Sequence, residues 1–232
     1  KNCSIAIVEP NTSNPSVNKS FHTRVSAITP SSEAYLKSLN IWDDIKRKQV
    51  FVATKVWDQN SHGRLNFHAK DENMEHLGYI IENDLIQSAL FGGIDKHKIE
   101  YINAKLSGLK KTDNGYEVNL DNQTNLSCQL LVGADGANSQ VRTLSAIEVT
   151  ERDYQQKAII ANIVSDKPFQ QTTWQRFLSD SIIALLPLSE NQASIVWSCK
   201  NHLADELIKL DRDKFNQSLS EVQVKGGRDG YN

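Results

Sequence analysis

The stretch LVGADGANSQVR, Leu131–Arg142, carries the residues with the clearest potential for chemistry. Leu130 to Val132 is predicted to be a buried strand, and Gly133 and Gly136 enclose Asp135 at its carboxyl end. In open α/β sheets, ligands bind outside the carboxyl ends of the strands. An aspartate there can accept a hydrogen bond from a sugar hydroxyl, while glycines let a phosphate or a ring approach the backbone. The alternative, equally open at this point, is a tight turn in which Asp135 caps the next helical turn.

A second acid has the same placement. Glu9 follows Ser4 to Val8, an aliphatic run predicted to be a buried strand of a parallel sheet. In dinucleotide-binding units, an acid at the end of the second strand binds the ribose about 20 residues beyond a glycine-rich fingerprint. Counting back from Glu9 puts that fingerprint before Lys1, and the printed sequence contains no GxGxxG. Glu9 is therefore predicted to bind a ribose or, alternatively, to be a solvated acid.

Composition and spacing argue against several other chemistries. The six histidines are scattered without an HExxH or HxH pair, so neither a metal site nor a catalytic residue is assigned. Three cysteines without CxxC spacing suggest no disulfide framework and a reducing compartment. A net charge of -2 argues against nucleic acid as a partner. The longest apolar run, Ser181–Leu188, is far shorter than the roughly 20 residues of a membrane-spanning helix.

Alternating strands and helices must position these groups in the first 130 residues or so. A start signal at Thr29-Pro30 predicts a helix over Ser31–Lys46, and the following period of two predicts a hairpin over 51–68. Asn83 or Asp84 is expected to cap a helix through Leu90, stopped by Gly92-Gly93. Further strands are expected at Leu77–Ile81 and as a meander over Ile99–Cys128.

After Arg142 the pattern becomes more purely β, which favours an antiparallel sheet. A charged, amphipathic helix is expected over His202–Leu219. The predicted strands are Ala158–Val164, Thr173–Leu178, Ile182–Leu188 and Ala193–Cys199.

Several stretches together resemble the FAD-dependent aromatic-ring hydroxylases of ubiquinone biosynthesis, such as the 2-octaprenylphenol hydroxylases. The similarity extends from Ser4 to about Leu219. It is carried by GADGANSQVR, RVSAI at Arg24–Ile28, KVWD at Lys55–Asp58, YIIEN at Tyr79–Asn83 and SIVWS at Ser194–Ser198.

The resemblance implies an α/β (α+β) fold, with a partial Rossmann-like FAD-binding domain and an antiparallel β-sheet substrate domain, as in flavoprotein aromatic hydroxylases. The FAD-binding domain would comprise residues 1–50 and 76–150, and the substrate domain 51–75 and 151–220. Residues 221–232 are expected to form an irregular tail. Family members carry a GxGxxG loop and a second Gly-Asp motif, and both are missing from the printed sequence. We therefore expect an incomplete chain.

Carried over residue by residue, the resemblance implies five cofactor-binding residues. Glu9 would hold the adenosine ribose of FAD, and Arg24 would lie near the phosphates and the ribityl chain. Asn83 would contact the cofactor from the start of a helix. Asp135 and Gly136 belong to the motif that, in the family, faces the FAD pyrophosphate and the groove for the nicotinamide nucleotide.

The activity implied is hydroxylation of a prenylated phenol with molecular oxygen, FAD and NAD(P)H, because the flavin performs the redox chemistry. Leu185, Pro187 and Trp197 are expected to face the phenol, with a role in the sheet core as the alternative. The protein is expected to be cytoplasmic. Because a polyprenyl substrate lies in the bilayer, the resemblance also implies peripheral contact at the inner membrane or a biosynthetic complex. Two alternatives stay open. One is a flavin hydroxylase of another aromatic compound, which predicts an arginine-containing pocket; the strands predicted after Arg142 contain Arg176 as their one arginine. The other is a noncatalytic binding or scaffold module.

Overall fold

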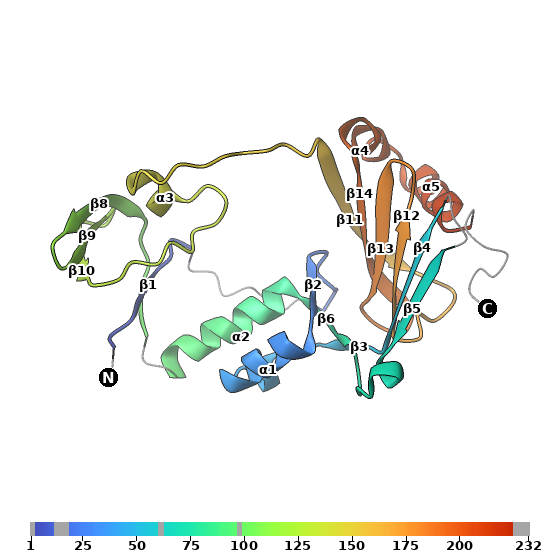
Figure 1. Ribbon diagram of the computed structural model, residues 1–232, viewed down its shortest axis with the longest axis horizontal. Helices are drawn as coiled ribbons and strands as arrows, with labels where there is room; N and C mark the ends of the chain where they lie inside the picture. The colour runs from blue at the N-terminus through green and yellow to red at the C-terminus, as the bar shows by residue number, and fades with distance from the viewer. Residues whose placement is uncertain (1–2, 12–18, 60–62, 97–98, 225–232) are drawn as a thin grey trace. The chain divides into compact units, whose positions relative to one another are not determined.

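The computed structural model describes residues 3–11, 19–59, 63–96 and 99–224 (Figure 1). The chain divides into two compact units. Lys1–Asn14 and Gly92–Arg152 form the first, and Pro15–Phe91 and Asp153–Asn232 form the second. These bounds differ from those predicted for the FAD-binding and substrate domains, and the functional assignment of the domains stays a prediction.

The first unit holds a parallel strand pair and a three-stranded antiparallel meander. Val118 and Leu120 form its core, against which Val8 and Ile102 pack. The meander predicted within Ile99–Cys128 is confirmed, although the first strand of that range pairs with the N-terminal strand instead of joining it. The elements are β1 (Ala6–Val8), β7 (Glu100–Ile102), β8 (Leu106–Thr112), β9 (Gly115–Leu120), β10 (Asn125–Cys128) and α3 (Gln140–Leu144).

Two sequence predictions fail in this unit. Leu130–Val132, predicted to be a buried strand, is irregular, and the side chains of Leu130 and Val132 are 77% and 72% exposed. The apolar pattern favours a strand, but a strand also needs a hydrogen-bonded neighbour, and no described strand pairs with this segment. β1 is parallel to β7 as predicted, yet Ile5 and Ile7 are exposed, so β1 is not buried.

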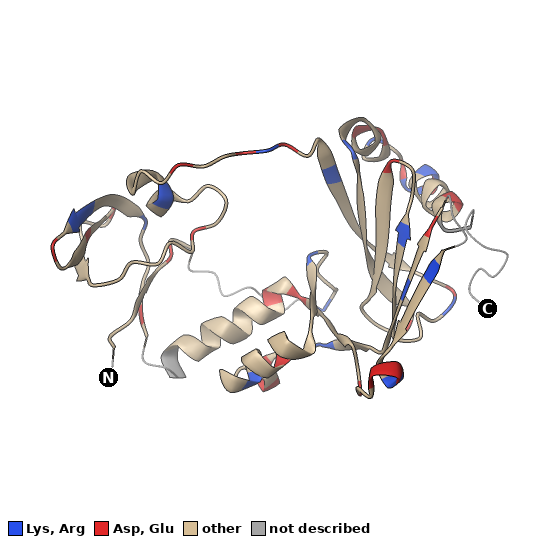
Figure 2. Ribbon diagram, in the orientation of Figure 1, with Lys and Arg blue, Asp and Glu red and all other residues tan. Residues whose placement is uncertain are grey.

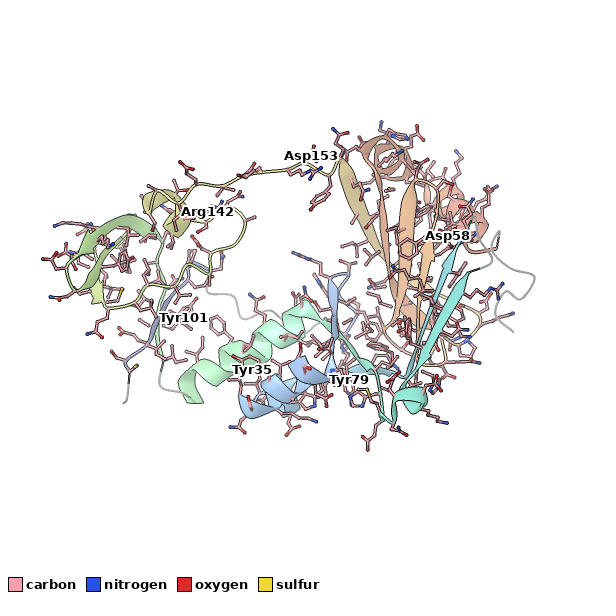
Figure 3. All side chains as sticks on the ribbon, viewed as in Figure 1. Tyr35, Asp58, Tyr79, Tyr101, Arg142 and Asp153 are labelled. Atoms are coloured by element: carbon pink, nitrogen blue, oxygen red, sulfur yellow. The ribbon has the colours of Figure 1, made fainter. Side chains whose placement is uncertain are left out.

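The second unit contains a small antiparallel sheet of order β2-β6-β3 that carries two helices. Leu36 of the first helix packs with Ile81 and Leu85, and Trp42 contacts the ring of Tyr79, which is labelled in Figure 3. The elements are β2 (Val25–Ile28), α1 (Pro30–Ser38), the 3-10 turn η1 (Trp42–Asp44), β3 (Gln49–Phe51), β6 (Gly78–Glu82) and α2 (Asn83–Lys96), which runs into the first unit at Gly92.

The helix boundaries in this unit differ from the predicted ones. Thr29 caps α1 by accepting a hydrogen bond from the Ser32 backbone, as the sequence predicts. The helix ends at Ser38 and not near Lys46, because Asn40 adopts a left-handed φ of 55° that a continuing helix forbids. Conversely, the glycine pair does not stop α2, which continues to Lys96.

A six-stranded sheet of order β11-β14-β13-β12-β4-β5 dominates the second unit. The antiparallel strands predicted after Arg142 are confirmed, and the predicted hairpin joins them through a parallel pairing of β4 with β12. The elements are β4 (Ala53–Asp58), β5 (Arg64–His68), the 3-10 turn η2 (Ala69–Glu72), β11 (Gln156–Val164), β12 (Thr172–Phe177), β13 (Ser181–Pro187), β14 (Gln192–Lys200), α4 (Asn201–Leu207) and α5 (Arg212–Val224).

The single helix predicted over His202–Leu219 is two helices, α4 and α5. The break has a local cause: the Asp211 side chain accepts a hydrogen bond from the Lys214 backbone and so starts a new helix. α5 continues to Val224, so residues 221–224 are helical and not part of an irregular tail. The rest of the predicted tail, 225–232, lies outside the described residues.

The two faces of the six-stranded sheet have different environments. α4 and α5 lie on one face (Figure 1), where Leu207 and Leu219 pack on Ile183 and Trp197. On the opposite face, apolar side chains remain partly open to solvent: Leu65, Phe67, Ile160, Phe177 and Ile182. Both faces are therefore apolar, but only one is covered by helices of the described chain.

A buried acid on α1 ties that helix to the turn before β6. Glu33 accepts hydrogen bonds from Lys37 and pairs with the His76 ring, each at 2.7 Å. Burial opposes ionisation of Glu33, but hydrogen bonds from Lys37 and His76 outweigh it and hold the pKa of the carboxyl below its ordinary value. This cluster thus stabilises the folded state in the ionised form.

We expect Glu33→Gln to lower the free energy of unfolding at neutral pH by about 1.5–3 kcal/mol, as for other hydrogen bonds to charged groups. Because the folded-state pKa is depressed, the contribution is present above the ordinary value of 4.5 and is lost as pH falls through the folded pKa. Urea unfolding across acidic pH measures this, with the exposed acid Glu72→Gln as control. Parallel pH profiles for wild type and Glu33→Gln would contradict it.

Candidate functional site

Glu9 lies where the sequence predicts, directly after β1 and at its carboxyl end. Its backbone is held by Tyr101 and Asn103, which donate side-chain hydrogen bonds to the Glu9 carbonyl at 3.2 and 3.1 Å. One carboxylate oxygen, Oε1, accepts from the backbone and side chain of Asn11, both at 2.9 Å. The other oxygen has no hydrogen bond to a described residue, so it is available to accept from a sugar hydroxyl.

The Asp135 carboxylate binds residues four to six positions further along the chain. Its carboxylate accepts a 2.5 Å hydrogen bond from the Ser139 hydroxyl and further bonds from the backbone N–H groups of Gln140 and Val141. Hydrogen bonding to Ser139, aided by these backbone donors, lowers the pKa of Asp135. This geometry matches the turn and capping alternative. The predicted contact of Asp135 with a cofactor stays a prediction.

Gly133 and Gly136, the two glycines of the motif, have different structural roles. Gly136 has a φ of +81°, which L side chains rarely adopt, and a Cβ there would meet nothing within 4 Å. A Cβ on Gly133 would lie 3.0 Å from the Val141 side chain, so this glycine permits close packing of α3. Arg142, labelled in Figure 3, donates to the Ala137 carbonyl at 2.6 Å and so braces the same turn. The backbone at Gly136 is therefore fixed in shape and open to a ligand.

In the second unit, the structure brings Arg24 and Asn83 together. Asn83 begins α2, and its backbone N–H donates to the Arg24 carbonyl at 3.1 Å. The Ser26 hydroxyl donates to Asn83 Oδ1 at 2.7 Å, which orients the amide. The Arg24 side chain is exposed and forms no ion pair with a described residue. An exposed guanidinium without an ion-pair partner among the described residues suits a phosphate group, because it presents positive charge and N–H donors.

A hydrogen-bond network that the sequence did not reveal anchors the segment leading to Arg24. The buried carboxylate of Glu82 accepts from the His22 backbone at 2.7 Å and from the Arg47 guanidinium at 2.9 and 3.0 Å. Arg47 also lies 4.9 Å from the Phe21 ring centroid. The sequence shows the acid Glu82 directly before Asn83, but it does not reveal its partners, which are 35 and 60 residues away. A cavity of about 280 Å³ adjoins the network, lined by Phe21, Lys46, Arg47, Lys48, Gln49, Ile80, Glu82 and Leu188.

The three predicted substrate residues lie within the sheet and not on its open surface. Leu185 and Trp197 belong to the core beneath α4 and α5, and Pro187 is also fully buried. Their position matches the alternative role in the sheet core. Contact with substrate stays a prediction for all three.

Sheets with helices and an acid at the carboxyl end of a strand are typical of proteins that bind a nucleotide cofactor. The fold is that of FAD-dependent monooxygenases. The crystal structure of PqsL, a probable FAD-dependent monooxygenase from Pseudomonas aeruginosa, has a TM-score of 0.73 at 16% identity, over 95% of this chain and 59% of that chain. The structure of CtdE in complex with FAD has a TM-score of 0.60 at 13% identity, over 85% and 53%.

Residues 18–226 match the protein family described as FAD binding domain, and the chain belongs to that family. Curated relatives agree. The mitochondrial ubiquinone biosynthesis monooxygenase COQ6 of Xenopus tropicalis is 35% identical over 218 residues, covering 88% of this chain and 47% of that protein. The 3-demethoxyubiquinol 3-hydroxylase of Escherichia coli is 33% identical over 178 residues, covering 75% and 45%. The chain spans about half the length of these relatives. The resemblance drawn from the sequence motifs is thereby confirmed.

We expect Gly136→Ala to lower the free energy of unfolding by about 1 kcal/mol, because the left-handed backbone disfavours an L side chain even where space is free. The matched change Gly92→Ala, at a helical glycine that also has open space, should raise it by up to about 1 kcal/mol. Urea titration of both variants measures the difference. Equal effects of the two substitutions would show that φ at Gly136 imposes no constraint.

Proposed function

We propose that this chain is part of an FAD-dependent, NAD(P)H-using monooxygenase that hydroxylates the ring of a prenylated phenol in ubiquinone biosynthesis. The observation that carries the proposal is the joint match to the FAD-binding family and to enzymes named for ubiquinone biosynthesis. The exposed Arg24 supports it: its guanidinium forms no ion pair with a described residue, and a flavin nucleotide brings phosphates that need such a partner.

The chain's own residues would hold separate parts of FAD. Glu9 would accept a hydrogen bond from a ribose hydroxyl through its unused oxygen. Arg24 would pair with phosphate oxygens, and Asn83 would donate from its amide nitrogen, since its oxygen already accepts from Ser26. At Gly136, the open backbone offers the approach that the pyrophosphate needs.

When bound, FAD would supply the transfer of electrons from NAD(P)H and the insertion of one oxygen atom from molecular oxygen into the ring. The protein would bind and orient the phenol and exclude water from it. This division explains why neither the sequence nor the described structure points to a nucleophile or a general base, and no catalytic residue is assigned.

The helix-free face of the six-stranded sheet is the surface we propose for the apolar part of the substrate. Phe67 and Phe177 are 52% and 37% exposed there, beside the partly exposed Leu65 and Ile182. Figure 2 shows that the strands of this sheet are mostly uncharged. Burying such side chains against a prenyl chain is favourable, because apolar area is removed from water.

The two alternatives are distinguished by specific observations. A hydroxylase of a carboxylated aromatic compound needs a cation facing its substrate, but Arg176 is buried and pairs in register with Ile183, a core residue of the helix-covered face. A noncatalytic scaffold would bind no flavin. Flavin that stays with the purified protein would count against the scaffold.

Contact with a membrane is part of the proposal. Within the described ranges, no helix is long and apolar enough to cross a bilayer. Because a polyprenyl chain partitions into lipid, we propose that the protein containing this chain acts peripherally at a membrane or within a biosynthetic complex. The COQ6 relatives are named as mitochondrial.

The chain should retain FAD after excess cofactor is removed, and Arg24→Ala should weaken FAD binding about tenfold or more, from the loss of a charge-assisted bond to phosphate. Arg64→Ala, at an exposed arginine on β5, is the matched control and should bind FAD as the wild type does. Quenching of flavin fluorescence measures both. A chain that retains no flavin would contradict autonomous binding, and equal losses in both variants would contradict the role of Arg24.

In the protein containing this chain, Phe177→Ala should raise KM for a prenylated phenol by about tenfold or more, because an aromatic contact with the prenyl chain is lost. FAD affinity should not change. The assay follows phenol-dependent NAD(P)H oxidation together with a product heavier by one oxygen atom. Ile208→Ala, at an exposed apolar residue outside the sheet, is the control. An unchanged KM would remove Phe177 from the substrate face, and the absence of hydroxylated product would contradict the proposed function itself.

A further inference from the structure

Arg176 is a buried cation that lacks a partner. It lies on β12 with a side chain only 1% exposed, and it is the largest of the fully buried side chains. Its three guanidinium nitrogens form no hydrogen bond. No carboxylate among the described residues forms an ion pair with it. Burial lowers the pKa of Arg176 from its ordinary value, and no neighbouring charge offsets that effect.

The register of the sheet places this side chain in an apolar row. Across the strands, Arg176 lies between Ile183 on β13 and Trp57 on β4, and Ile183 in turn pairs with Trp197 on β14. Ile183 and Trp197 belong to the core that α4 and α5 cover. Arg176 therefore points to the helix-covered face, away from the surface proposed above for the substrate.

The nearby aromatic rings do not replace an anion. Trp57 and Trp174 meet edge to face at 5.8 Å, and the cation over the Trp174 ring is Lys55, at 4.6 Å from its centroid. No such contact with Arg176 occurs among the described residues. Five N–H donors of a fixed planar fork are thus held in a low-dielectric environment without acceptors.

Burying a guanidinium in this way is unfavourable for folding, because the group loses its hydration and forms no hydrogen bond or ion pair in its place. Arginine is also effectively always charged, so it cannot escape by releasing a proton. Other buried ionic groups of this chain are paired: Glu33 with Lys37 and His76, and Glu82 with Arg47. Arg176 is the exception within the described part of the second unit.

We propose that Arg176 is an oxyanion-binding site inside the helix-covered core of the six-stranded sheet, and that its ligand is a carboxylate-type group bound by the planar fork of the guanidinium. Two sources have this chemistry: a free small oxyanion, or the carboxylate of an acidic side chain outside the described residues. Bidentate pairing satisfies two or more donors at once and is the geometry for which arginine is suited. The site lies on the face of the sheet opposite the surface proposed for the substrate.

The first experiment tests a free oxyanion on the full chain. Sodium formate replaces sodium chloride at constant ionic strength, and thermal unfolding is followed. Formate should raise the Tm of the wild type by about 2–4 °C or more, the scale of a modest stabilisation in a chain of this size. Arg176→Met should abolish the response, because methionine fills similar space without charge. Arg64→Met, which removes an exposed arginine of the same sheet, should keep it.

The second experiment supplies a carboxylate from a side chain. Ile183 is the cross-strand neighbour of Arg176, so Ile183→Glu places an acid within its reach. In the presence of Arg176, this substitution should lower the Tm less than it does in the Arg176→Met background, and the difference is the coupling between the two groups. The comparison is between backgrounds, so it stays informative even though Ile183→Glu disturbs the core.

The outcomes separate the two sources. A formate response that depends on Arg176 supports the site and shows that free oxyanions reach it. Coupling with Ile183→Glu in the absence of a formate response supports the site and favours a side-chain carboxylate over a free oxyanion as its ligand. If formate acts equally on wild type and Arg176→Met, and the cost of Ile183→Glu is the same in both backgrounds, the proposal is overturned.

Discussion

The alternation of side chains along six hydrogen-bonded strands is the constraint on which the second unit depends. Once the register of β12 is set against both β13 and β4, every residue of this strand has a fixed face. Ile183, Leu185 and Trp197 then pack under α4 and α5, while Phe177 and Ile182 turn to the other side. The parallel pairing of β4 with β12 is what extends both faces across the hairpin of β4 and β5. Core, proposed substrate surface and buried cation are all consequences of one register.

Buried carboxylates are paired wherever the described chain supplies the partners. Glu33 draws on Lys37 within its own helix and on His76 from the turn before β6, and it is stabilised in the ionised form. Glu82 ends β6 and binds both Arg47 and the His22 backbone, so it holds together three segments that are distant in sequence. The hydrogen bonds of these acids hold a strand, a helix and a loop together. Glu82 also fixes the positions of Asn83 and Arg24. Asn83 follows Glu82 directly, and the Asn83 backbone donates a hydrogen bond to the Arg24 carbonyl.

Local patterns in the sequence predicted much of the fold, and the misses among the strands depend on neighbours that are distant in sequence. The strands after Arg142, the hairpin, the Thr29 cap and the strand-end position of Glu9 depend on alternation and capping chemistry over a few residues, and all are found. Leu130–Val132 failed because a strand is decided by its neighbour, which no short pattern reveals. The covered face of β13 could not be predicted either, since Ile182 and Ile183 are equally apolar and only the helices distinguish them. Family resemblance supplied the cofactor roles that spacing alone left open.

The geometry of the GADG turn changes how that motif is best understood. Asp135 already receives three donors, one from Ser139 and two from the backbone, and these bonds build the start of α3. A carboxylate so engaged has little capacity left for a ligand, and its charge is partly balanced by the N–H groups it accepts. Gly136, in contrast, has a fixed left-handed backbone and open space where a side chain would be. If a cofactor binds at this turn, the backbone of Gly136 is the surface it meets, and Asp135 contributes by holding that backbone in place.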